Sequence, residues 1–175
     1  MVETILVIVA LLVLAVLIYA ATKPSTFRLQ RSIVINALPE QVFPLINDFH
    51  RWSDWSPWEK KDATMKKIHR GPPKGKGAVL EWEGNKDVGT GRMEVLESVP
   101  SSKTLIKLDF LTPFEAHNRA EFTLVRGAGT TEVRWAMYGP QPYMMKVMGV
   151  FCSMDKMVGK DFEDGLASLK AIAEN

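Results

Sequence analysis

An uninterrupted apolar segment near the N-terminus constrains this chain more than any other feature. Residues Ile5–Ala21 contain no charged side chain, no glycine and no proline. At 1.5 Å of rise per residue, a helix over this segment is roughly 25 Å long, and Glu3, Thr4 and Thr22 extend it toward the ~30 Å hydrocarbon core of a bilayer. Every face of this helix is apolar, which a core helix packed on one side does not need. The segment therefore predicts a membrane-spanning helix over residues 1–24.

A cleaved signal peptide is the alternative interpretation of this segment. Signal peptides have a basic first region and a small-x-small cleavage site, whereas this chain opens with Met-Val-Glu-Thr and places Tyr19 before two alanines. An uncleaved anchor is the better interpretation. Glu3 precedes the segment, and positive charges follow it at Lys23, Arg28 and Arg31. Because positively charged flanks stay on the cytoplasmic side, we expect a single-pass membrane protein whose domain faces the cytoplasm.

The remaining residues, 25–175, are enough for one domain with a sizeable core. Cys152 is the only cysteine in the sequence, which excludes an intrachain disulfide and fits a reducing compartment. The formal net charge is +2 and no Arg/Lys stripe alternates with aromatic residues, so we expect no nucleic-acid partner. The histidines, at positions 50, 69 and 117, lack metal-ligand spacing, and no G-x-S-x-G motif occurs. We expect neither a metal nor a cofactor.

Apolar periodicity along the domain changes from strand to helix, then to strands, then to helix. Residues 27–35 alternate as a strand, and a helix begins at Pro39, where Pro44 should kink or shorten it. Period-two runs follow at residues 78–82, 93–95, 106–110, 114–124 and 133–137, separated by glycine and proline turns. A long helix is predicted over Pro142–Ala173. This order predicts a two-layer α+β domain in which a curved antiparallel sheet wraps around the terminal helix.

Several segments resemble a known superfamily. They are residues 31–37 (RSIVINA), 39–43 (PEQVF), 52–58 (WSDWSPW), 121–124 (EFTL) and 133–135 (VRW). Together they make residues 31–175 resemble the START-like helix-grip superfamily, in particular its SRPBCC or polyketide cyclase-like subgroup. The resemblance implies an apolar, ligand-binding cavity between the concave sheet face and the terminal helix. It implies no set of catalytic residues, because the superfamily shares a cavity rather than a mechanism.

The inward-facing residues of this predicted fold are the candidate ligand contacts: Trp55, Trp58, Trp82, Met93, Phe110, Asn118, Ala120, Trp135, Met144, Met148 and Phe151. The methionines of the terminal helix suit an adaptable cavity wall, or are ordinary core residues. Trp52 is expected to anchor a loop, while Trp55 and Trp58 are expected to form an aromatic gate. Asn118 has the inward parity of its strand and could bind a ligand, or equally a backbone group at a bulge.

Three function classes remain open. We favour a membrane-anchored domain that binds a lipid or another apolar small molecule. An enzyme of the cyclase or dehydratase type is the alternative, and its acid, base and polar candidates would be Arg31, Asp54, Asn118 and Tyr138. Tyr143 is a weaker candidate beside the last helix. The third class is an interaction domain whose own side chains fill the cavity. A basic cluster over residues 60–76 could touch anionic lipid, but such clusters are more often solvated faces.

Overall fold

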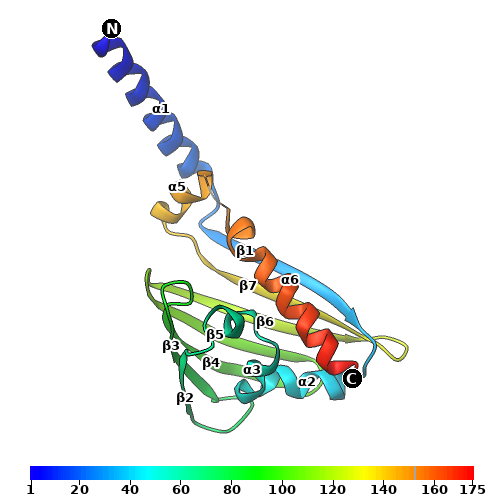
Figure 1. The fold of residues 1–175 in the computed structure, drawn as a ribbon. Coiled ribbons are helices and arrows are strands. Elements are labelled where there is room, and N and C mark those ends of the chain that lie inside the picture. Colours follow the sequence, from blue (N-terminus) through cyan, green and yellow to red (C-terminus); the bar gives the residue numbers. More distant parts are fainter. Residues whose placement is uncertain (152) are drawn as a thin grey trace.

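The fold has two layers, a curved antiparallel sheet and the helices on its concave side, with one long helix extending away from both (Figure 1). This computed structural model describes residues 1–151 and 153–175. The helices are α1 (Val2–Thr22), α2 (Pro39–Asn47), η1 (Phe49–Arg51), α3 (Trp52–Trp55), α4 (Pro57–Lys61), α5 (Tyr143–Phe151) and α6 (Met154–Ala173). The strands are β1 (Thr26–Ile35), β2 (Lys66–Arg70), β3 (Val79–Glu83), β4 (Thr90–Val99), β5 (Lys103–Thr112), β6 (Ala116–Arg126) and β7 (Thr131–Pro140).

All seven strands pair antiparallel in the order β1-β7-β6-β5-β4-β3-β2. The strands β2 to β7 therefore follow one another as a meander, and β1 closes the far edge against β7. Alternate residues of each central strand face the helices, as the period of two requires. On β6, for example, Asn118, Ala120, Phe122 and Leu124 are buried. The predicted α+β helix-grip architecture is confirmed.

The core lies where α6 crosses the sheet. Phe162, Leu166 and Leu169 of α6 are almost completely buried. The ring of Phe162 stacks on that of Trp135, with centroids 4.1 Å apart and planes 22° apart. Trp135 in turn stacks on Phe122 of β6 at 4.9 Å. Aromatic rings bury large apolar areas, so this stack fixes α6 to the middle of the sheet.

The terminal helix is not continuous, and the prediction of one helix over Pro142–Ala173 is wrong. The structure divides it into α5 and α6. Ser153 precedes α6 in an extended conformation, and its Oγ accepts a hydrogen bond from the Lys156 amide at 3.3 Å. Serine is a preferred N-cap because its hydroxyl binds a free amide of the first turn. The apolar stripe continues across the break, which is why periodicity alone did not reveal it.

Two boundaries also differ from the predicted ones. The helix after Pro39 ends at Asn47 with Pro44 inside it, so the helix does not end at that proline. The side chain of Asp48 then accepts the His50 amide and begins the short η1 turn. The predicted strand from Phe114 begins only at Ala116 in the structure, and Phe114 is exposed in the β5–β6 hairpin.

The N-terminal helix α1 leaves the domain as an extended rod (Figure 1). By length and composition it can span a membrane, and Ala20 is its one fully buried residue. Its C-terminal end contacts α5, where the Tyr143 hydroxyl donates a hydrogen bond to the Leu17 carbonyl at 2.8 Å. The helix therefore meets the domain at α5 and at the start of β1.

Candidate ligand-binding site

A cavity of about 1010 Å³ lies between the concave sheet face and the helices α3 to α6. Its wall includes buried apolar side chains from five adjacent strands: Leu80, Trp82, Met93, Leu108, Ala120, Trp135 and Met137. Helix α6 adds Met154, Val158 and Phe162. Small-molecule sites are apolar clefts of ~300–1,000 Å³ with a few polar groups. The cavity is therefore large enough for a ligand of lipid or polycyclic size.

Most residues predicted as ligand contacts lie on this wall. They are Trp58, Trp82, Met93, Phe110, Asn118, Ala120, Trp135, Met148 and Phe151. Trp82 meets Phe110 edge to face at 5.9 Å on neighbouring parts of the wall. The structure thus brings these residues together around one space, while their contact with a ligand remains a prediction.

Two predicted residues lie off the wall. Trp55 is 1% exposed, and its indole N–H donates to the Leu45 carbonyl at 2.9 Å. It is packed under Phe122 and Trp135 as an anchor, so it cannot act as a gate. Met144 is on α5, does not line the cavity and is 69% exposed.

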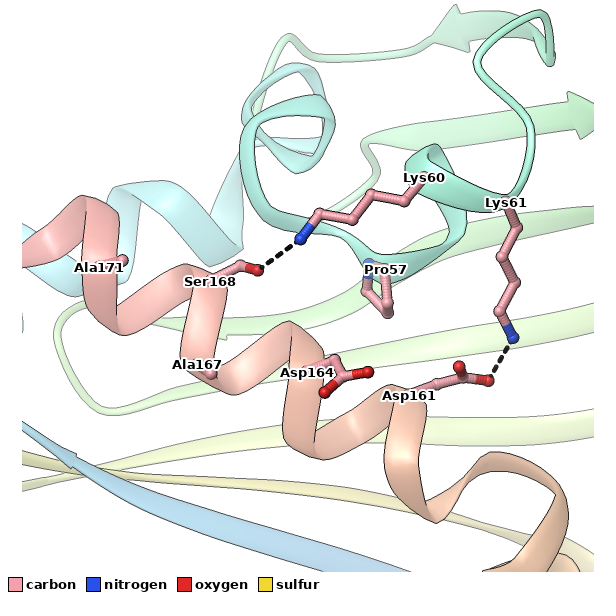
Figure 2. A pocket seen from close by; sticks show the side chains of 8 residues that line it. All are labelled: Pro57, Lys60, Lys61, Asp161, Asp164, Ala167, Ser168 and Ala171. Atoms are coloured by element: carbon pink, nitrogen blue, oxygen red, sulfur yellow. Dashed lines mark hydrogen bonds and ion pairs between the residues drawn. The ribbon is translucent and has the colours of Figure 1, made fainter.

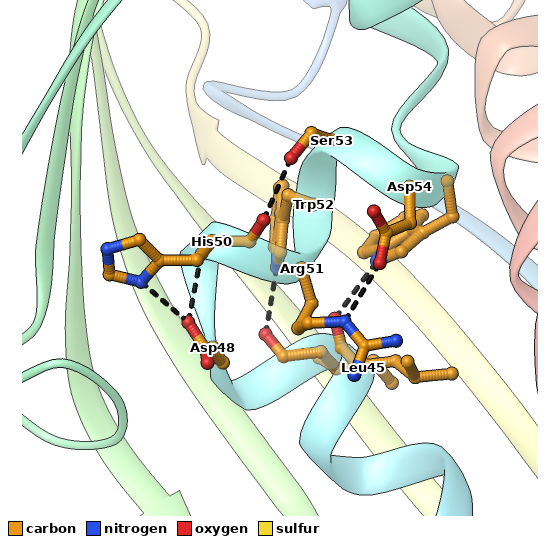
Figure 3. A network of polar contacts seen from close by, with 9 residues as sticks. Leu45, Asp48, His50, Arg51, Trp52, Ser53 and Asp54 are labelled. Atoms are coloured by element: carbon orange, nitrogen blue, oxygen red, sulfur yellow. Dashed lines mark hydrogen bonds and ion pairs between the residues drawn. The ribbon is translucent and has the colours of Figure 1, made fainter.

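Of the tryptophans in residues 52–58, Trp52 anchors the loop as predicted, whereas Trp55 differs from its prediction. Trp52 is an anchor, because its N–H donates to the Ile46 carbonyl at 2.9 Å (Figure 3). Its ring also lines the cavity. Trp58 is half-buried on the wall, edge-on to Trp135 at 5.7 Å. The short α3 turn brings Trp52 and Trp55 to one side, so both can hydrogen-bond to the end of α2.

Asn118 provides a polar group deep in the wall. Its side chain is buried on β6 and lines the cavity next to Gly139 of β7. Within the described residues, its side-chain amide makes no hydrogen bond. Buried amides normally have partners, so Asn118 is available to bind a polar atom of a ligand. The buried hydroxyl residue Ser56 also lines the wall.

Two fully buried side-chain polar atoms among the described residues have no hydrogen-bond partner, the Thr104 hydroxyl and the Trp135 indole N–H. Trp135 is 2% exposed, and no hydrogen-bond partner for its Nε1 exists among the described residues. An unpaired buried donor costs about 1–3 kcal/mol. Neighbouring side chains cover this nitrogen, so a ligand in the cavity cannot reach it.

The other polar residues predicted from the sequence lie outside the cavity. Arg31 forms ion pairs with Asp155 at 2.6 Å and Glu163 at 2.7 Å, and so joins β1 to α6. These hydrogen bonds raise the pKa of Arg31. Asp54 is exposed and pairs with Arg51 at 2.8 Å (Figure 3). Tyr138 is half-buried, and the Arg28 guanidinium carbon lies 5.0 Å from the centroid of the Tyr138 ring. Tyr138 has no atom on the cavity wall.

Titratable side chains on the wall are confined to its rim. None of those that line the cavity is buried: Lys23, Glu59, Lys61, Lys86, Asp87, Glu115, His117, Asp155 and Asp161. His117 hydrogen-bonds to Asp109 at 2.8 Å, which raises the pKa of the imidazole. Burial opposes ionisation of Asp109, but hydrogen bonds from Lys107 and His117 lower its pKa. The interior is therefore apolar, with Asn118 and Ser56 as its buried polar side chains.

A second, more open hollow of about 610 Å³ lies between α4 and α6 (Figure 2). Lys61 crosses it to Asp161 at 2.6 Å, and Lys60 reaches Ser168 at 3.3 Å. Within the predicted basic cluster, Lys67 and Arg70 likewise pair with carboxylates, Glu59 and Glu81. Much of the cluster's charge is thus neutralised within the domain. No group of three or more His, Cys, Asp or Glu among the described residues is placed to hold a metal ion.

Sequence reasoning missed the part of the wall that comes from turns. Lys23 and Pro24 after α1, Val88 in the β3–β4 turn and Pro113 in the β5–β6 hairpin all line the cavity. Phe114 lines it too, from the hairpin rather than from the strand in which it was predicted. Their positions depend on how distant segments meet. The period of two carries no signal for turn residues, whereas it did place the strand residues correctly.

The fold resembles several solved structures. The Zhui aromatase/cyclase from a Streptomyces species matches with a TM-score of 0.60 and 12% identity, over 85% of this chain and 94% of that chain. Protein CV1439 from Chromobacterium violaceum matches with a TM-score of 0.59 and 17% identity, over 87% of this chain and 99% of its own. A protein of the dynemicin biosynthetic locus matches at 0.57 and 18%, over 87% of this chain and 48% of its own. At these identities the similarity shows the fold alone.

Sequence comparison identifies the family. No curated protein sequence matches the chain. The model of the family described as "Polyketide cyclase / dehydrase and lipid transport" matches residues 26–174, which is the whole domain after α1. This agrees with the resemblance carried by the WSDWSPW segment and the strands around it. The chain belongs to the polyketide cyclase/dehydrase and lipid transport family.

Proposed function

We propose that the protein is a membrane-anchored domain that binds a lipid or another apolar small molecule in its cavity. The observation that carries this proposal is the composition of the wall. A space of about 1010 Å³ is lined mainly by aromatic and aliphatic side chains, and its buried polar side chains are Asn118 and Ser56. Burying apolar surface contributes about 25 cal/mol per Å². The cavity therefore favours a largely apolar ligand with one or two hydrogen-bonding atoms.

The N-terminal helix supports the membrane part of the proposal. α1 is long and apolar enough to span a bilayer, and its side chains are exposed except near the domain. A surface of this kind is unstable in water but suits lipid. We propose that the domain lies on the cytoplasmic side, because Lys23 follows the helix directly while Glu3 precedes it.

Cyclase or dehydratase chemistry is less well supported. Proton transfer needs an acid or base within hydrogen-bond reach of the reacting atom. The titratable groups that line the cavity lie at its rim, and Arg31, Asp54 and Tyr138 lie off the wall. The distribution of polar groups favours binding over catalysis.

The test is to fill the cavity and measure bound ligand. Ala120 is 3% exposed in the middle of the wall, so Ala120→Trp adds an indole to that space. Ala128→Trp in the exposed β6–β7 turn adds the same side chain far from the cavity. The full-length chain and both variants are purified in detergent micelles, released for native mass spectrometry, and extracted to identify any bound molecule.

We expect a stoichiometric apolar adduct on the parent chain and on Ala128→Trp, and its loss from Ala120→Trp. Circular dichroism checks that Ala120→Trp remains folded. Should the parent chain stay free of adduct after incubation with membrane lipids and aromatic metabolites, the binding proposal is wrong, and a self-filled interaction domain becomes the better interpretation.

A further inference from the structure

Helix α5 has an apolar face that no part of the domain covers. None of its residues is buried, and Met144 and Phe151 are 69% and 73% exposed. Met148 is 43% exposed on the same helix. Large apolar side chains that gather on one exposed surface usually mark a contact with a partner or a membrane.

The contact of α5 with α1 indicates what kind of surface covers its apolar face. α5 lies beside the C-terminal end of α1 (Figure 1), and the Tyr143 hydroxyl is hydrogen-bonded to the Leu17 carbonyl at 2.8 Å. Leu17 is five residues before the end of α1 at Thr22. At 1.5 Å per residue, Tyr143 meets α1 about 7–8 Å inside that end. Helices that lie in a membrane interface bury their apolar face to a depth of ~5–10 Å.

The side chains around this junction suit the interface. Tyr19 of α1 and Tyr143 of α5 are both exposed here, and the Lys23 ammonium lies 5.0 Å from the Tyr19 ring centroid. Tyrosine and lysine near the ends of spanning helices are typical of the headgroup level. Lys146 is the one charged residue in the sequence of α5.

Exposed side chains at this same end of the domain line the cavity, which indicates that its mouth lies here. Met145, Met148 and Phe151 of α5 line it, as do Lys23 and Pro24 next to α1. The opposite rim is the β5–β6 hairpin, where Phe114 lines the cavity and is 69% exposed. The mouth is therefore bordered by apolar side chains that are also accessible from outside.

We propose that α5 lies in the membrane interface beside α1 and opens the cavity mouth onto the bilayer, so that the ligand is a membrane lipid entering directly from the leaflet. This rests on the proposed function, because it requires α1 to span the membrane and the cavity to hold a ligand. It adds the ligand class and its route. A ligand that enters in this way keeps its apolar part away from water throughout.

The test measures the depth of α5 in a bilayer. The full-length chain with Cys152→Ser is given one spin-labelled cysteine at Met144, reconstituted in phosphatidylcholine/phosphatidylglycerol nanodiscs, and compared in its accessibility to oxygen and to a water-soluble nickel chelate. Met144 has no atom on the cavity wall. Leu11→Cys in the middle of α1 is the reference for the hydrocarbon core, and Ile68→Cys, 51% exposed on β2, is the aqueous reference.

We expect the label at Met144 to favour oxygen, as at Leu11, while the label at Ile68 favours the nickel chelate. An aqueous label at Met144 together with a lipid-exposed label at Leu11 would overturn the inference and leave the anchor intact. Aqueous labels at both positions would show that the anchor itself is wrong.

A second measurement addresses the route of the ligand. Met144→Glu places a charge on the proposed membrane contact without altering the cavity wall, and Ile68→Glu is its matched control. We expect Met144→Glu to slow the uptake of a fluorescent phospholipid from nanodiscs severalfold, with unchanged final occupancy when the same lipid is supplied in detergent. Equal uptake rates for both variants would overturn the route, and no uptake by the parent chain would instead count against the proposed function.

Discussion

Helices α5 and α6 are neighbours in sequence with similar apolar stripes, yet the burial of these stripes differs between them. α6 buries Phe162, Leu166 and Leu169 against the sheet, whereas α5 buries none of its residues. An apolar stripe shows that a helix has one face unsuited to water. It does not show whether protein or lipid covers that face.

The difference follows from what each helix meets. α6 is joined to β1 by the ion pairs of Arg31 and lies close to the sheet because Gly159 and Gly165 leave room for neighbouring side chains. α5 instead contacts α1, and the Tyr143 hydroxyl donates a hydrogen bond to the Leu17 carbonyl of that helix. Helix α6 belongs to the core of the domain, and α5 lies at its junction with α1.

Truncation of one apolar residue in each helix tests this contrast with the largest expected effect. Leu169 is fully buried on α6, so Leu169→Ala should lower the free energy of unfolding by about 2–5 kcal/mol through lost burial and a residual cavity. Met144→Ala on α5 should lower it by less than about 0.5 kcal/mol, as exposed positions do. Denaturant titration of the full-length chain in micelles, followed by tryptophan fluorescence, measures both. Similar losses for the two variants would show that α5 is part of the core.

Glycine replacement gives a smaller effect and a closely matched pair. A Cβ at Gly165 of α6 would lie 2.9 Å from Trp135 Cζ3 and 3.0 Å from Pro57 Cδ. Gly165→Ala should therefore destabilise the domain by about 1–3 kcal/mol through overpacking. A Cβ at Gly149 of α5 would meet only Gln141 Nε2 at 3.5 Å, an ordinary contact. Gly149→Ala should be neutral, or stabilise by up to about 1 kcal/mol through helix propensity.

Thermal unfolding of the two glycine variants, measured in the same micelles, decides this prediction. A stable Gly165→Ala would mean that α6 can move away from Trp135 and that the aromatic stack is less tightly packed than the structure indicates. A destabilised Gly149→Ala would mean that α5 is held by contacts on more of its surface.

The contrast between α5 and α6 also shows which parts of the candidate site could be predicted from the sequence and which could not. Period-two runs placed Trp82, Phe110, Ala120 and Trp135 on the cavity wall, because a strand in a one-sided sheet has a fixed inward parity. The helical period placed Met144 among the ligand contacts, because its position in the apolar stripe is equivalent to those on α6. The break at Ser153 has only a local signal, a serine that is a good N-cap, within an otherwise regular pattern.

Short turns were the other source of error. Trp52, Trp55 and Trp58 are too close in sequence for periodicity to tell which ring faces the cavity. Their orientation depends on the hydrogen bonds of Trp52 and Trp55 to the carbonyls at the end of α2. The resemblance to the family implied a cavity. Tertiary contacts, however, determine which tryptophan anchors the loop and which lines the wall.

The smallest expected effect is a pH dependence of stability. It should come from the β6 rim of the cavity and not from the contacts of α5 or α6. Neither the Arg31 ion pairs of α6 nor the Tyr143 hydrogen bond of α5 depends on a group that ordinarily titrates between pH 6 and 8. His117 on the β6 rim does titrate near this range, and its hydrogen bond to Asp109 raises its pKa above the ordinary 6.5. A raised pKa means that the folded state binds this proton more tightly than the unfolded chain does.

The stabilisation from His117 should therefore be complete below pH 6.5 and be lost as the pH rises through its raised folded-state pKa. The measurement is the difference in Tm between the parent chain and His117→Gln from pH 5.5 to 9, in which contributions of His50 and His69 cancel. We expect a difference of a few degrees or less at low pH that disappears at high pH. In the same series, the depth of a spin label at Met144 should stay constant, since α5 contains no histidine. If the depth of the label changed as His117 titrates, the two rims of the cavity would move together. The position of α5 would then depend on the rest of the domain.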